Sequence, residues 1–127
     1  MSKQQILMIE DDEEMIALGE LILTKEGYEV HWATSGATGL EILRANPIDL
    51  VLLDIMMDGM DGWQVLESIK NDPQLAHIPV VMLTARHYLE DEQATAAHQG
   101  QYASYLVKPF IVHELIDEVR KVLQAIE

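Results

Sequence analysis

The stretch Leu50-Val51-Leu52-Leu53-Asp54 decides the fold, because four successive apolar residues end abruptly in a carboxylate. An unbroken apolar run of this length is typical of a strand that is buried on both faces of a sheet. Strands of this kind belong to parallel sheets with helices packed on both sides. The stretch therefore predicts an α/β protein in which Asp54 lies at the carboxyl end of a central strand.

Three more apolar runs end in polar residues in the same way. Residues 6–9 are followed by Glu10, Asp11 and Asp12, residues 80–83 by Thr84, and residues 105–107 by Lys108. Parallel strands point in one direction, so their carboxyl ends meet at one edge of the sheet, where such sheets place their functional sites. We therefore expect carboxylates, a hydroxyl and an ammonium to lie together at that edge.

Stretches with helical spacing of apolar residues separate the strands and give five predicted helices. These helices begin near Glu13, Ser35, Gly62, Glu90 and Ile111. Residues 28–33 alternate polar and apolar, which indicates a half-exposed edge strand. Five repeated βα units predict a three-layer, doubly wound sandwich around a five-stranded parallel sheet. The edge character of the second strand favours the flavodoxin-like order 2-1-3-4-5, with the switch point between the first and third strands.

The sequence makes specific predictions for two of these helices. In the first, Met15, Leu18 and Ile22 recur at helical spacing and are predicted to face the core. Gly27 is predicted to end that helix. Residues 90–99 carry little apolar surface beyond alanine, so the fourth helix is expected to be weakly anchored.

Composition restricts the class of protein. A chain of 127 residues with 49% hydrophobic residues is expected to form a single domain over residues 1–127. The absence of Cys excludes disulfides and thiolate chemistry. No apolar run approaches the roughly 18 residues of a membrane span, and no signal-peptide core is present, so a cytoplasmic protein without membrane contact is expected. The formal charge of -14 would repel a phosphate backbone, which argues against direct nucleic-acid binding.

The carboxylates gathered at the strand ends predict a bound cation. Two unit charges about 4 Å apart at an effective dielectric constant near 20 repel by roughly 4 kcal/mol, and a cation relieves this repulsion. A set of oxygen ligands without His or Cys suits Mg²⁺ or Mn²⁺. With such an ion, Asp54 would be the nucleophile of a phosphoryl transfer, while Lys108 and Thr84 would neutralise the phosphoryl oxygens.

Four motifs, in this order, resemble the receiver domain of two-component response regulators. They are residues 6–11, Asp54 followed by Met60-Asp61-Gly62, Thr84-Ala85, and Lys108-Pro109-Phe110. Each motif alone is common, whereas all four at the ends of apolar runs are specific. The resemblance spans nearly the whole chain. It implies a signalling module rather than an enzyme, which accepts a phosphoryl group on Asp54 from a histidine kinase or phosphotransfer protein and assists its own phosphotransfer and slow dephosphorylation.

The resemblance also implies how the metal is held. Glu10, Asp11 and Asp54 would bind Mg²⁺, and the backbone carbonyl of Met56 would complete the site. Asp12 is either a further ligand or the cap of the first helix, and the cap is the favoured interpretation.

Thr84 and Tyr105 match the switch pair of the family, in which the Thr moves toward the phosphoryl group and the aromatic ring turns inward. The alternative is that Tyr105 is only a packed aromatic residue. The resemblance implies that the signal leaves through the face formed by the fourth helix, the fifth strand and the last helix. That face would contact a downstream effector protein or an output domain, and dimerisation through it remains open. The chain is then either a free-standing regulator or a receiver domain from a longer protein.

Two residues depart from the family pattern or modulate it. Asp58 stands where the family usually has Pro, and we hypothesise that it loosens the loop and tightens divalent-ion binding, the alternative being a solvated loop acid. Arg86 lies at a position that influences the lifetime of the phosphoryl group in this family.

Other functions remain open from the sequence. An FMN-binding flavodoxin-like protein shares this strand order, although the acidic stretch 10–14 would repel the phosphate of FMN. A receiver-like module that binds a partner without being phosphorylated is a further alternative, against which the complete set of acids, Thr and Lys counts. An aspartate-dependent phosphatase would need an Asp-x-Asp pattern after the first strand, where this chain has Glu10-Asp11-Asp12.

Overall fold

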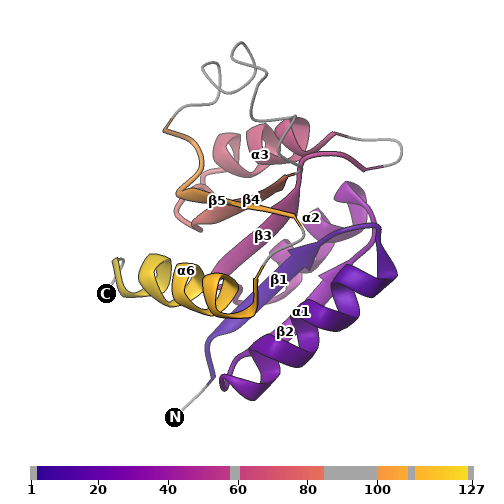
Figure 1. The fold of residues 1–127 in the computed structure, drawn as a ribbon. Coiled ribbons are helices and arrows are strands. Elements are labelled where there is room, and N and C mark those ends of the chain that lie inside the picture. The colour runs from indigo at the N-terminus through magenta and orange to yellow at the C-terminus, as the bar shows by residue number, and fades with distance from the viewer. Residues whose placement is uncertain (1–2, 58–60, 85–99, 109–110, 126–127) are drawn as a thin grey trace.

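The computed structural model describes residues 3–57, 61–84, 100–108 and 111–125. In chain order the elements are β1 (Gln5–Ile9), α1 (Glu13–Lys25), β2 (Glu29–Ala33), α2 (Gly36–Ala45), β3 (Leu50–Asp54), α3 (Gly62–Asn71), β4 (Val80–Thr84), β5 (Ser104–Val107) and α6 (Val112–Ala125). Figure 1 shows the helices packed around the sheet. None of the helices in the described part of the chain is long and apolar enough to cross a membrane.

The five strands form one parallel sheet in the order β2-β1-β3-β4-β5, which confirms the predicted topology. The described residues contain four helices where five were predicted for the chain. The fourth predicted helix, residues 90–99, lies outside the described residues.

The burial of each strand follows its sequence pattern. The unbroken apolar runs of β3 and β4 are buried at every position, and in β1 only the first residue is partly exposed. The alternating strand β2 is half exposed at the sheet edge, as predicted. Successive residues of β1 point into different layers: Leu7 and Ile9 pack with α2 and α3, while Ile6 and Met8 pack with α1 and α6.

Helix α1 begins and ends where the sequence predicted, and two of the three residues predicted to face the core do so: Ile22 is buried and Met15 packs against the core, whereas Leu18 does not. The Asp12 carboxylate accepts hydrogen bonds from the first-turn N–H groups, which confirms it as the N-cap, and Gly27 follows the helix with φ +92°. Leu18, predicted to face the core, is 39% exposed. Gly19 lies instead over β1, where a Cβ would come within 2.7 Å of the Met8 sulfur. The helix thus meets β1 through Gly19, while Leu18 lies at the edge of the buried face.

Candidate metal centre

Sheet register brings Glu10 and Asp54 side by side. Ile9 of β1 pairs with Leu53 of β3, so the next residue of each strand reaches the same level at the carboxyl edge. Both carboxylates are buried, with residue exposures of 0% for Glu10 and 3% for Asp54. Two acids buried next to each other in an otherwise apolar sheet are unfavourable unless a cation accompanies them.

The same register places Thr84 and Lys108 at this edge. Thr84 pairs with Val107 across β4 and β5, and the Lys108 N–H donates to the Thr84 carbonyl oxygen at 2.7 Å. Thr84 is fully buried, one residue beyond the Leu83 that pairs with Asp54. The polar residues at the ends of β1, β3, β4 and β5 thus lie at the same edge of the sheet, as the sequence predicted.

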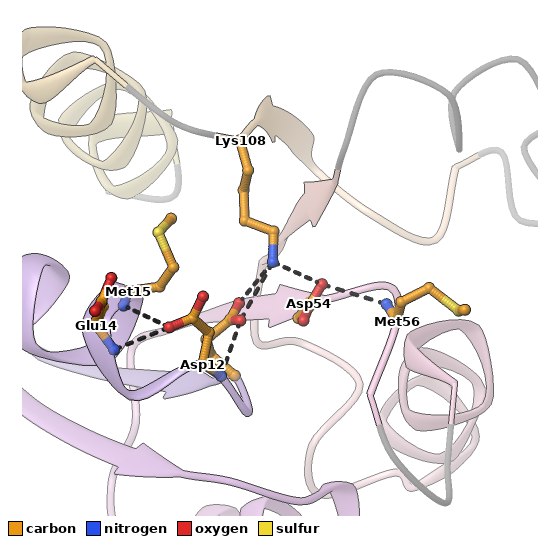
Figure 2. Close-up of polar contacts among 7 residues, drawn as sticks. Asp12, Glu14, Met15, Asp54, Met56 and Lys108 are labelled. Atoms are coloured by element: carbon orange, nitrogen blue, oxygen red, sulfur yellow. Dashed lines mark hydrogen bonds and ion pairs between the residues drawn. The ribbon is translucent and has the colours of Figure 1, made fainter.

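Lys108 bridges the two buried carboxylates. Its Nζ lies 3.0 Å from Oε2 and 3.2 Å from Oε1 of Glu10, and 3.1 Å from Oδ1 of Asp54. Figure 2 shows the Lys108 side chain extending toward Asp54. Asp54 Oδ1 also accepts a hydrogen bond from the Met56 N–H at 3.2 Å. These donors hold the Asp54 carboxylate in one orientation.

A third carboxylate, that of Asp11, completes a candidate cation site. Glu10, Asp11 and Asp54 each offer an oxygen atom, and the three atoms lie within 4.8 Å of one another. Asp11 is exposed, so the cluster is open to solvent on that side. These three carboxylates and the Lys108 ammonium sum to a net charge of -2 when all four are ionised. The oxygen-only donor set and this charge fit a hard divalent cation such as Mg²⁺.

Burial and charge shift the pKa values of these groups. Burial, followed by the negative charge of Asp54, raises the pKa of Glu10 from 4.5 to about 7, although Lys108 opposes the shift. Burial also raises the pKa of Asp54, again against the effect of Lys108. For Lys108, burial alone would lower the pKa, but the hydrogen bond to Glu10 and the negative charges of both acids raise it overall. The Lys108 ammonium therefore stays charged at neutral pH.

Other predicted site residues lie around this cluster or beyond the described residues. Met56 lies two residues after Asp54, and the residue is 52% exposed. Tyr105 is 48% exposed on β5, where it pairs with Met82, two residues before the end of β4. Asp58 and Arg86 lie outside the described residues, so their assigned roles stay predictions.

Gly62 is a site residue whose role the sequence analysis missed. It is the first residue of α3, directly after the capping residue Asp61. A Cβ on Gly62 would lie 2.2 Å from the Asp54 carbonyl oxygen and 2.7 Å from the Ile55 Cα. The Gly62 N–H also donates to the Ile55 carbonyl oxygen at 2.5 Å. The signal was present as Gly after an N-cap Asp, but only the fold shows that the helix start rests on the backbone of Asp54.

A match to a known protein family identifies the kind of protein that carries this site. Residues 6–120 match the family described as the response regulator receiver domain. The chain belongs to this family. It is the receiver domain of a two-component response regulator, a signalling module, and neither the relatives nor the similar structures support a flavin-binding protein.

The receiver domain is similar to curated relatives and to solved structures. It is 36% identical to the heme response regulator HssR of Staphylococcus epidermidis over 118 residues, which cover 93% of this chain and 50% of that protein. With HssR of Staphylococcus aureus the identity is 38% over 120 residues, covering 94% of this chain and 51% of that protein. The receiver domain thus spans about half the length of these relatives.

Among solved structures, the chemotaxis response regulator CheY4 of Vibrio cholerae superposes with a TM-score of 0.86 at 25% identity, covering 95% of this chain and 99% of CheY4. The N-terminal domain of a response regulator receiver protein from Methanoculleus marisnigri gives a TM-score of 0.78 at 39% identity, covering 96% of this chain and 98% of that one.

Proposed function

We propose that this receiver domain accepts a phosphoryl group on the Asp54 carboxylate and thereby switches a signalling pathway. The contact that carries the proposal is the 3.1 Å ion pair between Asp54 Oδ1 and Lys108 Nζ, beside the oxygen cluster of Glu10 and Asp11. This arrangement has a nucleophile and a fixed positive charge at one point, which are the principal requirements of phosphoryl transfer.

The donor would be a phosphohistidine of a histidine kinase or phosphotransfer protein. An Asp54 oxygen attacks the phosphorus atom in line, the new O–P bond forms, and the P–N bond breaks. The imidazole leaves with the electron pair and takes a proton from solvent. Lys108 and the Thr84 hydroxyl neutralise charge on the phosphoryl oxygens as it builds up.

Glu10, Asp11 and Asp54, with the Met56 carbonyl, would hold Mg²⁺, or Mn²⁺ in its place. When bound, the ion neutralises negative charge on the transferring phosphoryl group. The fit rests on the three carboxylate oxygens within 4.8 Å and on the excess negative charge of the cluster. In the free protein Lys108 balances part of that charge, so metal and ammonium would share the two buried acids.

Thr84 and Tyr105 would transmit the effect of phosphorylation to the face that binds a partner. Thr84 is buried beside the acceptor, whereas Tyr105 is 48% exposed, so an inward turn would bury its ring. The affected face would include β5 and α6 and would bind an effector protein, an output domain or a second receiver domain. These events would take place in the cytoplasm, where the kinase supplies the phosphoryl group.

Intact-mass measurement tests the proposal. The wild type, Asp54→Asn and Asp117→Asn are incubated with Mg²⁺ and acetyl phosphate. The Asp117→Asn variant removes an exposed acid on α6 and serves as the matched control. We expect the mass of one phosphoryl group to be added to the wild type and the control but not to Asp54→Asn. Absence of the adduct from the wild type, or its presence in Asp54→Asn, would overturn the assignment.

A further inference from the structure

A hollow beside the edge strand β2 combines an exposed indole ring with two carboxylates. It has a volume of about 250 Å³ and is lined by Glu13, Ile16, Ala17, Glu20, Trp32 and Thr34. Helix α1 and strand β2 lie in contact (Figure 1), and together they supply five of the six lining residues. None of its lining residues is among those assigned to phosphoryl transfer, so the hollow is a separate feature of the surface.

Trp32 presents a large aromatic ring to solvent. The residue is 52% exposed, while its neighbour Ala33 is buried. Trp is enriched where proteins contact partners, because it offers a large apolar surface together with a polar N–H. The face of the indole ring is electronegative and attracts cations. An exposed indole beside acidic groups is therefore suited to a positively charged ligand.

Two glutamates of α1 border the same hollow. Glu13 and Glu20 are two helical turns apart, about 10 Å along the axis, with the small residue Ala17 between them. Both are exposed, and neither forms an ion pair within the described residues. Because Ala17 has only a methyl group, the space between the two carboxylates and the indole stays open.

We propose that this hollow binds the side chain of an arginine presented by a partner protein. A guanidinium is planar, so it can stack on the Trp32 ring while its N–H groups donate to Glu13 or Glu20. A lysine ammonium lacks the planar face and the fork of donors. The volume of about 250 Å³ is below the range of about 300 to 1,000 Å³ that holds small-molecule ligands, which favours a single side chain. The formal charge of -14 further favours a basic partner segment.

The probe for this proposal is the capped peptide acetyl-Gly-Arg-Gly-amide, titrated into the full chain and followed by NMR. We expect saturable shifts of the Trp32 indole N–H and of the Ala17 amide. The same peptide with citrulline, which keeps the shape but lacks the charge, should bind more weakly by about 5-fold or more. Replacing Trp32 by Leu should weaken arginine-peptide binding by about 2- to 5-fold, the range of an exposed cation–π contact.

Two further variants separate a shaped site from general attraction. Ala17→Leu fills the hollow while keeping both charges and a strong helix former, so saturable binding should disappear. Glu20→Gln should weaken binding, whereas Glu41→Gln, the same change on the exposed face of α2, should leave it unchanged. Phosphorylation of the Trp32 and Ala17 variants by acetyl phosphate reports that they are folded. Equal binding of the two peptides, or equal losses in Glu20→Gln and Glu41→Gln, would overturn the proposal.

Discussion

Replacing Glu10 by Gln removes a buried charge while keeping the shape of the side chain. In the folded protein the pKa of Glu10 is raised to about 7 by burial and by Asp54, against an ordinary value of 4.5. The folded state therefore holds this proton more tightly than the unfolded chain does. The contribution of Glu10 to the free energy of unfolding is therefore fully present below pH 4.5, the pKa of this group in the unfolded chain. It is lost as the pH rises through about 7, the pKa in the folded protein.

The size of the effect follows from the shift in pKa. At about 1.4 kcal/mol for each pKa unit, the change from 4.5 to about 7 corresponds to about 3 kcal/mol lost across the whole range. Between pH 5.5 and pH 8 the wild type should lose about 2 kcal/mol of this. Gln cannot ionise, so the Glu10→Gln variant should gain about 2 kcal/mol over the wild type across that range.

Urea unfolding followed by far-UV circular dichroism measures this difference, in EDTA at several pH values from 5.5 to 8. The range stays above the pI of about 4.5, where the net charge keeps the protein soluble. Glu41→Gln, on the exposed face of α2, is the control and should follow the wild type. A wild-type stability that is constant with pH, with Glu10→Gln running parallel to it, would refute the reasoning.

Three further predictions concern the same edge of the sheet. Gly62→Ala forces a Cβ against the Asp54 carbonyl and should cost about 1 to 3 kcal/mol in urea unfolding, with slower phosphorylation by acetyl phosphate; unchanged stability would contradict the close approach. Lys108→Ala removes the ammonium that faces Asp54, so phosphorylation should slow by about 100-fold while Mg²⁺ binding, measured by calorimetry, is kept or strengthened. Asp12→Ala should cost about 1 kcal/mol through loss of the α1 cap, and a large loss of Mg²⁺ affinity would show that Asp12 is a ligand instead.

The sheet could be predicted because its central strands are buried on both faces. Double burial requires apolar residues at every position, so β3 and β4 stand out as unbroken runs, and β2 shows its edge position by alternation. The buried face of α1 could be predicted only in part. Helical spacing correctly identifies Ile22 and Met15, but it also includes Leu18, which is exposed, and it gives no sign that Gly19 lies directly over Met8.

The site could be predicted from the polar residues at the strand ends, since parallel strands bring those ends together. Glu10 and Lys108, separated by 98 positions, are joined by a hydrogen bond as this rule implies. The position of Gly62 against the backbone of Asp54 could not be predicted, because glycine also occurs at helix starts without such a contact. The inward turn of Tyr105 stays a prediction.

Lys108 directly follows β5 at the edge of the sheet, yet its ammonium reaches past β4 to Asp54 of β3 and to Glu10, which directly follows β1. The edge of the molecule is thus tethered electrostatically to its centre. A dianionic phosphoryl group on Asp54 would attract the Lys108 ammonium more strongly than the Glu10 carboxylate does. This exchange would shift the carboxyl end of β5. The apolar layers on both faces of the sheet would keep their packing.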